Sequence, residues 1–335
     1  MNYTKWNDPK NYTRMTAELA EFSVPENPIF AARDDERIEH SFMQYCMTSV
    51  EELHDLLDDT DIAIIEAVAV AKYLNSLQIF EYITLRGFDV ARPRLRKRIL
   101  KLMKYRVIQE NEMVSASAAH GLKYYELDCF GYMLAVESGV NFHMGNRYVS
   151  YSKRKEKGMT DDTPCDVKRI LVGNQIILNL LMSNTHMQRF GIMETMRASD
   201  LEQAGGSCMI RTAANVRIDD ESVLAYEVVR DTPGSYEKLI SKVERYYNLV
   251  NNEEYLTSNY HGDHAYPQMI ICGESLKHNI KIAEYLRKNG MWSEDDTLLF
   301  TEDLLNMKRT LVSIYALADD NSQIWYVLPE KGSLQ

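Results

Sequence analysis

The residues whose types and spacing could do chemistry are most concentrated between Arg92 and Arg106, in the stretch RPRLRKRILKLMKYR. This stretch holds eight Lys or Arg residues and no acidic residue, whereas the whole chain has a formal net charge of −11. Ammonium and guanidinium groups bind phosphate oxygens, and a local excess so opposed to the overall charge indicates a surface for a negative partner. A basic but merely solvated helix face is the alternative interpretation.

The spacing of apolar residues predicts how this surface is built. If Pro93 opens a helix, Leu95, Ile99, Leu102 and Met103 fall on one stripe, and the basic side chains fall mainly on the opposite side. One face would then anchor the helix while the other meets phosphates. The expected DNA-binding residues, with a histidine from a later loop, are Arg92, Arg94, Arg96, Lys97, Arg98, Lys101, Lys104 and His120.

The segments around the basic helix have a recognisable order. Helices are expected over about 62–73 and 77–84, strands at 105–109 and 122–128, and a helix from about Phe130. The small residues 115–121 (SASAAHG) lie between the two strands. Helix, helix, basic helix, strand, loop, strand is the order of a winged helix-turn-helix, with 115–121 as the wing.

Two segments carry a resemblance to winged-helix DNA-binding domains. RLRKRILKLMKYRVIQ resembles their third helix and following strand, and YYELDCFGYMLA resembles the exit in which a glycine opens the next helix. The resemblance covers roughly residues 60 to 140. Because some winged helices bind protein instead, the basic face must decide between DNA and protein as the partner.

Composition limits the class of protein. At 335 residues, 45% hydrophobic and 26% charged, the chain is long enough for two globular domains. It has no apolar run of membrane-spanning length, and its first residues lack the apolar core of a signal peptide, so we expect a cytoplasmic protein without membrane contact. Five cysteines without a CxxC pair are expected to be reduced core residues.

The expected fold is α+β, with an N-terminal winged helix-turn-helix and an α/β/α domain that contains a mixed sheet. The expected parts are an N-terminal arm (1–50), the winged helix (51–145), a linker (146–166) and the α/β domain (167–335). In the linker, Lys153, Arg154, Lys155 and Lys157 could contact the DNA backbone.

The second half alternates strand and helix patterns. Its expected helices are 167–183, 236–250 and 276–289, and its expected strands are 190–197, 209–218, 222–230, 267–272 and 297–300. This order resembles the common core of PD-(D/E)xK nuclease-like proteins. The segment LAYEVVRDTPGSYEKLISKVERYY resembles a signature of the replication-relaxation family, whose members join a winged helix to a nuclease-like domain in plasmids and integrative elements.

The resemblance to the nuclease fold implies where a metal site would stand. Active members use an Asp on the second strand and the Glu of ExK to hold a divalent metal, with the Lys acting on water. Here Glu227 takes the Glu position, but Val229 stands at the Lys and Asn215 at the Asp, with Glu194 as a third member. We therefore expect no metal, no cofactor and no catalysis. A displaced set that uses Lys238 or Lys242, with Asp219 or Asp220, keeps a nuclease as the alternative.

Other patterns carry less information. His261-Gly-Asp-His264 has metal-ligand residue types without a further partner at a defined spacing, and Gly205-Gly206-Ser207 is expected to be a turn. The sequence thus predicts a non-enzymatic protein that binds double-stranded DNA in replication, mobilisation or transcriptional control of a plasmid or mobile element. A homodimer and replication or mobilisation proteins are the expected partners, and a winged-helix module for protein assembly is the third hypothesis.

Overall fold

The computed structural model describes residues 8–11, 29–41, 43–46, 48–118, 120–140, 162–197, 209–219, 222–259, 266–292, 298–318 and 320–331. The chain divides into two compact units: residues 1–22 with 33–174, and residues 23–32 with 175–335. The expected N-terminal arm therefore contributes to both units, and the division falls within a helix, after Asn174. Most of the expected linker, 146–161, lies outside the described residues.

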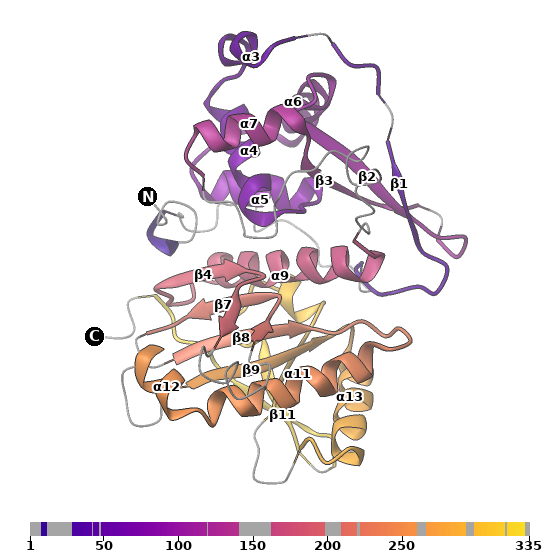
Figure 1. Ribbon diagram of the computed structural model, residues 1–335, viewed down its shortest axis with the longest axis vertical. Helices are drawn as coiled ribbons and strands as arrows, with labels where there is room; N and C mark the ends of the chain where they lie inside the picture. The colour runs from indigo at the N-terminus through magenta and orange to yellow at the C-terminus, as the bar shows by residue number, and fades with distance from the viewer. Residues whose placement is uncertain are drawn as a thin grey trace. The chain divides into compact units, whose positions relative to one another are not determined.

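The first unit combines helices with a small antiparallel sheet (Figure 1). Its sheet has the order β1-β2-β3, and the isolated bridge between Leu74 and Tyr125 attaches the segment between two helices to β3. The elements are η1 (Pro9–Asn11), β1 (Arg37–His40), α3 (Val50–Leu56), α4 (Asp59–Ala71), α5 (Ser76–Leu85), α6 (Arg92–Lys104), β2 (Ile108–Val114), β3 (Leu122–Leu127), α7 (Cys129–Glu137) and the first part of α9 (Pro164–Met182).

Helices α3, α4 and α5 each begin with a capping box, in which two side chains satisfy backbone N–H groups that the first turn leaves without a partner. The pairs are Ser49 with Glu52, Asp58 with Asp61, and Asn75 with Gln78. Helix α6 instead has Pro93 in its first turn, where a missing N–H costs nothing. These local signals explain where the four helices begin.

The expected strand from Tyr105 begins three residues later because α6 ends in a turn. Arg106 has φ of +55°, and Val107 N–H donates to Leu102 O at 2.9 Å while Arg106 N–H donates to Met103 O at 3.1 Å. This pair of bonds is a Schellman motif, which ends a helix and redirects the chain. Downstream, a Cβ on Gly131 would lie 1.9 Å from Val107 O, so the glycine permits α7 to lie against this turn.

The second unit contains a seven-stranded mixed sheet of order β12-β11-β10-β9-β8-β7-β4. Strands β8, β9 and β10 are parallel, and the other neighbours are antiparallel. Its elements are β4 (Arg189–Ile192), β5 (Thr195–Arg197), β6 (Met209–Arg211), β7 (Ala214–Arg217), β8 (Ser222–Val228), α11 (Ser235–Val250), α12 (Glu253–Asn259), β9 (Tyr266–Gly273), α13 (Leu276–Lys288), β10 (Leu299–Glu302), η2 (Leu305–Met307), β11 (Ile314–Leu317) and β12 (Gln323–Tyr326).

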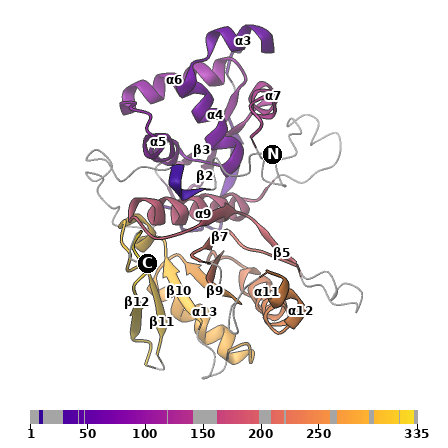
Figure 2. The same cartoon turned by 90° about the vertical axis from the view of Figure 1, so that its left-hand side faces the viewer.

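Helices α11 and α13 cover one face of this sheet (Figures 1 and 2). Their apolar stripes, with Leu239, Val243 and Ile282, join Ala225 and Ile271 of the central strands in one buried cluster. Strands β8 and β9 are each followed by helical structure that returns the chain to the edge at which the next parallel strand begins, as the alternating pattern predicts. The core therefore fixes the orientation of α11 over β8.

The predicted α+β class with a mixed sheet is confirmed, but several elements differ from expectation. The strands expected at 190–197 and 209–218 are each divided into two, and Met193 at the first break has φ of +53°. The sequence analysis missed elements whose patterns are short or polar: β1, α3, α12, β11 and β12.

Two further expectations concern cysteines and membranes. Four cysteines lie among the described residues, none of them in a disulfide; Cys272 is buried and Cys46 is exposed, so the expectation of core positions is wrong for Cys46. No helix formed by the described residues combines the length and the apolar character needed to cross a membrane.

Candidate nucleic-acid interface and the site around Glu227

Helix α6 is anchored through its apolar stripe, as predicted. Leu95, Ile99, Leu102 and Met103 are all buried, with exposures of 0–5%. The helix packs against α5 and β2, which fixes the direction in which its basic side chains point. Those side chains fall into two groups with different surroundings.

The first group, Arg98 and Lys101, is engaged by carboxylates. Arg98 Nη1 lies 2.9 Å from Asp61 Oδ1 and 2.7 Å from Asp58 Oδ1, and Lys101 Nζ lies 2.8 Å from Asp61 Oδ2. The Asp61 side chain is fully buried, and Lys101 also donates to Leu56 O at 2.6 Å. The expectation that these two cations are free to meet phosphates is therefore wrong: they neutralise a buried carboxylate at the start of α4.

The charged groups in this cluster change one another's pKa values. Partial burial raises the pKa of Asp58, but the hydrogen bond from Arg98, the backbone N–H groups of Asp61 and Thr60 and the charge of Arg98 together outweigh it, so the pKa of Asp58 is lowered. Partial burial likewise opposes the charged form of Arg98, but bonds to Asp58 and Asp61 raise the pKa of Arg98 on balance. Both shifts favour the ionised pair and therefore the folded arrangement.

The second group of basic side chains is exposed. It consists of Arg94, Arg96, Lys97 and Lys104. Within the described part of the chain, no ion pair involves any of these four. Arg92 is also exposed, and its guanidinium lies 5.5 Å from the centre of the Phe80 ring. The surface that can meet phosphates is thus narrower than the sequence suggests and is displaced away from α4.

The loop between β2 and β3 was expected to act as a wing. In the structure Ser115 and Ala116 both donate to the carboxylate of Asp35, with distances of 2.7 Å from Ser115 Oγ and 2.6 Å from Ala116 N. The bond from Ser115 is the main cause of a lowered pKa at Asp35. His120 is exposed at the end of this loop. An ionised aspartate at the loop tip opposes phosphate binding there.

The strands of the hairpin also carry carboxylates. Lys123 Nζ lies 2.7 Å from Glu110 Oε1 and 4.0 Å from Glu112 Oε2, so its charge is already balanced. Tyr125 also donates to Glu110 at 2.9 Å. Sequence reasoning overlooked these carboxylates because it considered the small residues of the loop and not the strands that carry it.

In the second unit, the nuclease-like positions lie on neighbouring strands. Asn215 pairs with Ala225 across β7 and β8, so Asn215 and Glu227 point to the same face of the sheet, the face that α11 covers. Val229 is buried in the core beyond the end of β8. Glu194 lies outside the strands and forms an ion pair with Arg189 at 2.5 Å. The structure therefore brings Asn215 and Glu227 to one face of the sheet. The Glu194 carboxylate lies over Gly191, which pairs with Asn215, and it is engaged by Arg189.

One of the lysines considered as replacements does contact Glu227. Lys242 Nζ, on the second turn of α11, lies 2.5 Å from Glu227 Oε1 and 3.3 Å from Arg211 O. Asn215 accepts a hydrogen bond from Thr212 Oγ1 at 2.6 Å, and Asp219 caps the turn before β8 by accepting from Ser222 N at 2.6 Å. Lys238 is exposed, and Asp220 lies outside the described residues.

These groups do not form a metal centre in the part of the chain that is described. No three His, Cys, Asp or Glu side chains there are placed to hold one ion. A divalent cation needs several carboxylate oxygens, whereas this site offers Glu227 with an amide and an ammonium. The segments 205–207 and 261–264, singled out in the sequence, lie outside the described residues.

A second polar cluster, which sequence reasoning missed, lies at the carboxyl ends of the parallel strands. The buried Arg230 guanidinium binds Asp303 with distances of 2.7 and 3.0 Å. Burial alone would lower the pKa of Arg230, but the charge of Asp303 raises it. Arg230 also donates to Phe30 O, and Glu274 accepts from Ala32 N at 2.8 Å. This cluster fixes the segment 29–32 to the second unit. The signal in the sequence that could have revealed the cluster is the position of its charged residues, each of which comes within two residues of the end of a strand.

Comparisons with protein-family models, with curated proteins and with solved structures found no match.

Proposed function

We propose that the chain is a non-enzymatic protein that binds double-stranded DNA through helix α6. The order α4, Leu74 bridge, α5, α6, β2, β3 supports a winged helix-turn-helix with α6 in the recognition position. The observation that carries the proposal is the group Arg94, Arg96, Lys97 and Lys104, exposed on one anchored helix of a chain with net charge −11. Binding should therefore be local and oriented, because the rest of the surface repels phosphate.

Titration of a fluorescent duplex at several salt concentrations tests this proposal. Counterion release predicts that the logarithm of the binding constant falls linearly with the logarithm of salt concentration, by roughly 0.9 per phosphate contacted. Absence of binding at low salt, or a binding constant indifferent to salt, would remove DNA as the partner. If the chain does bind, selection of bound duplexes from a random pool would distinguish sequence-specific from non-specific binding.

For the second unit we propose a nuclease-like domain of the replication-relaxation type that has lost its metal site. The order α9, β4, β7, β8, α11, β9, with antiparallel β4, β7 and β8 and with β9 parallel to β8, supports the fold. Asn215 and Val229 at the two positions that would supply a ligand and a lysine support the lack of activity. The contact between Lys242 and Glu227 is what favours the alternative, a metal-dependent nuclease with a displaced lysine.

This unit also has a surface suited to self-association. Strand β12 is at the end of the sheet order. Three of its large apolar residues and the residue that follows it are 40–71% exposed: Ile324, Trp325, Tyr326 and Val327. No charged residue occurs from Gln323 to Pro329, so two copies can pair there without the repulsion that a net charge of −11 creates elsewhere. We propose antiparallel pairing of β12 with a second copy as the route to a homodimer.

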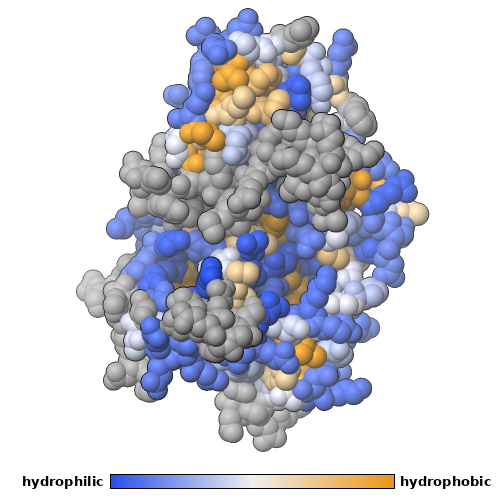
Figure 3. All heavy atoms as spheres, in the orientation of Figure 1, coloured by the Kyte–Doolittle hydropathy of each residue, from blue (hydrophilic) through white to orange (hydrophobic). Residues whose placement is uncertain are grey.

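A second exposed apolar surface lies on the first unit. Hydrophobic residues also gather on the surface of the first unit over α7, where Met133 and Val136 are about half exposed (Figure 3). Such a surface fits contact with a replication or mobilisation protein, and it is the observation that favours a protein-assembly role as an alternative. The cytoplasmic location and the role in a plasmid or mobile element stay predictions.

A further inference from the structure

A segment from the N-terminal part of the chain is bound at the carboxyl ends of the parallel strands of the second unit. Residues 23–32 belong to this unit, although residues 1–22 and 33–174 belong to the first. In the described part of this segment, which has no helix or strand, Phe30 is 1% exposed, whereas Ile29 beside it is 39% exposed. One enclosed aromatic side chain on an irregular stretch is typical of a bound peptide with a single anchor residue.

Two main-chain groups of the segment bind charged side chains of the second unit. Arg230 Nη1 donates to Phe30 O at 3.2 Å, and Ala32 N donates to Glu274 Oε1 at 2.8 Å. Arg230 and Glu274 are only 2% and 9% exposed. Hydrogen bonds to charged groups are stronger than those between neutral groups, and both of these are shielded from water. The second unit therefore binds the C=O of the aromatic residue and the N–H of the second residue after it.

The two charged side chains are held in place by the second unit itself. Arg230 forms its ion pair with Asp303 through two contacts of 2.7 and 3.0 Å. Glu274 Oε1 also accepts from Asp231 N at 3.0 Å, and Glu274 N donates to His278 Nδ1 at 3.1 Å. Their positions therefore do not depend on the segment. A site that is organised before its ligand arrives loses little entropy when the ligand binds.

The site lies at the edge of the sheet where α/β proteins commonly bind ligands. Arg230, Glu274 and Asp303 come within two residues of the ends of β8, β9 and β10. These strands are parallel, so the three side chains gather at one edge. In open α/β sheets the carboxyl ends of the strands carry the ligand site, and here residues 29–32 lie over them.

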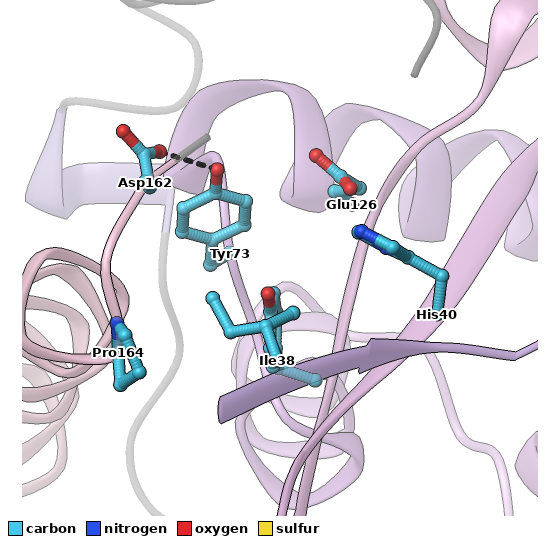
Figure 4. Close-up of a pocket in the computed structure, with 7 residues that line it drawn as sticks. Ile38, His40, Tyr73, Glu126, Asp162 and Pro164 are labelled. Atoms are coloured by element: carbon cyan, nitrogen blue, oxygen red, sulfur yellow. Dashed lines mark hydrogen bonds between the residues drawn. The ribbon is translucent and has the colours of Figure 1, made fainter. Parts of the chain in front are cut away.

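The pocket in the first unit has a different character, because its polar groups bind one another. Tyr73 donates to Asp162 Oδ2, as Figure 4 shows, and Lys72 Nζ lies 2.6 Å from the same oxygen. Glu126 accepts from Asn111 at 2.8 Å. These lining groups are engaged within the first unit. The groups at the edge of the second unit are instead engaged by a segment that comes from a distant part of the chain.

We propose that this edge of the second unit is a peptide-binding site, and that residues 29–32 occupy it as a tethered internal ligand. The site selects a linear segment with one buried aromatic side chain, whose C=O binds Arg230 and whose second following residue donates its N–H to Glu274. A segment of another protein with this pattern binds when it displaces the internal ligand. The proposal does not rest on DNA binding, because none of these contacts involves α6.

The test is binding of the peptide Ile-Phe-Ala-Ala-Arg-Asp, the sequence of residues 29–34 with a fluorescent label at its C-terminus, to the full chain. Phe30→Ala removes the internal anchor, so saturable binding by anisotropy is expected. The natural chain should bind at least about tenfold more weakly, because the tethered segment competes at a roughly millimolar effective concentration. Ile29→Ala is the matched control and should bind as weakly as the natural chain, since Ile29 is exposed.

Methylated peptides test the main-chain contacts without a change to the protein. Methylation of the peptide nitrogen that corresponds to Ala32 removes the donor to Glu274 and should weaken binding to Phe30→Ala by about tenfold. Methylation at the position of Arg33 should leave the affinity unchanged, because Arg33 N donates to Glu36 outside the site. Equal affinity of the two methylated peptides would overturn the proposal.

A second variant and a measurement on the natural chain keep the test decisive if Phe30→Ala does not fold. Ala32→Pro removes the N–H that Glu274 accepts but keeps Phe30, so it should also admit the peptide. In the natural chain, millimolar peptide should accelerate hydrogen exchange of the Ala32 amide, because displacement exposes this amide to water. Absence of saturable binding to the folded variants, equal affinity for the natural chain and Phe30→Ala, or unchanged exchange at Ala32 would each contradict the proposal.

Discussion

Arg98 and Asp61 form an ion pair 2.9 Å long in which the carboxylate is fully buried and the guanidinium is 21% exposed. The pair links the middle of α6 to the first turn of α4, where Asp61 also completes the capping box. A basic residue that appears in the sequence to belong to a ligand surface therefore stabilises the packing of two helices. The exposed cations of the same helix are left for phosphate.

Replacement of Arg98 should lower stability more than it lowers DNA affinity. Arg98→Met leaves Lys101 as the cation that pairs with the buried Asp61, and we expect the free energy of unfolding to fall by about 2 kcal/mol. This is less than the roughly 3–5 kcal/mol for a fully buried pair, because Lys101 remains and water reaches Arg98. Urea denaturation measures the change. Arg94→Met, on the exposed side of α6, is the control and should change stability by less than about 0.5 kcal/mol.

The salt dependence of duplex binding should depend on the exposed cations. Arg94→Gln with Lys97→Gln removes two charges, so the slope of the logarithm of affinity against the logarithm of salt should become shallower by about two. Lys277→Gln with Lys288→Gln removes two exposed charges from α13 and should leave the slope unchanged. Fluorescence anisotropy provides both slopes. An unaltered slope in the α6 variant would place the DNA surface elsewhere.

The hairpin next to α6 should make stability sensitive to acid. Burial alone raises the pKa of Glu110, but hydrogen bonds from Lys123 and Tyr125 lower it below the ordinary value of 4.5. A carboxyl group with a lowered pKa in the folded state stabilises the fold above its unfolded pKa, and this contribution is lost as pH falls through the folded pKa. Stability should therefore decline below about pH 4.5, and Glu110→Gln should flatten that decline in urea denaturation at several pH values.

The wing can be tested through its acidic partner. Asp35 accepts from Ser115 and Ala116, so an approach of the loop to DNA would bring a negative charge toward phosphate. If the loop contacts the duplex, Asp35→Asn should raise affinity by a few fold and shortening of 115–120 should lower it, both measured by anisotropy. If neither change alters affinity, the hairpin is not part of the interface.

Association through β12 should depend on one exposed side chain. Trp325 is 42% exposed and contacts Tyr315, so Trp325→Lys keeps the strand but places a charge in the proposed seam. Light scattering after gel filtration should show a dimer for the natural chain and a monomer for the variant. Met133→Lys, a change at a similarly exposed site on α7, should keep the dimer. A natural chain that is monomeric at high concentration would contradict the proposal.

Local patterns in the sequence predicted the elements whose signals lie within one segment. The apolar stripe of α6, the amphipathic α11 and the apolar β9 were all placed within a few residues. Strand β1, with the sequence RIEH, has no such signal, because pairing with β2 about 75 residues later stabilises it. For the same reason the sequence could not show which cations of α6 are neutralised. Arg98 binds Asp61, which is 37 residues away in the sequence, so this contact is known only from the folded chain.

Substitution of Glu227 tests whether this side chain has a structural or a catalytic role in the second unit. In Glu227→Gln the ammonium of Lys242 loses its carboxylate while it is only 17% exposed, so we expect a loss of about 1–2 kcal/mol in the free energy of unfolding. Lys242→Met in the same chain should restore part of that loss, because the ammonium that lost its contact with Glu227 is then removed. Glu237→Gln, on an exposed position of α11, controls for the loss of one charge.

The same variants decide between binding protein and nuclease. With one carboxylate, an amide and an ammonium, the site should not hold Mg²⁺ at cellular concentration, and the purified chain should leave supercoiled and linear DNA intact with Mg²⁺ or Mn²⁺. Duplex binding should be nearly the same in Glu227→Gln as in the natural chain, because the exposed cations of α6 are untouched. Metal-dependent cleavage that disappears in both Glu227→Gln and Lys242→Met, but persists in Glu237→Gln, would establish the nuclease alternative with Lys242 as the displaced lysine.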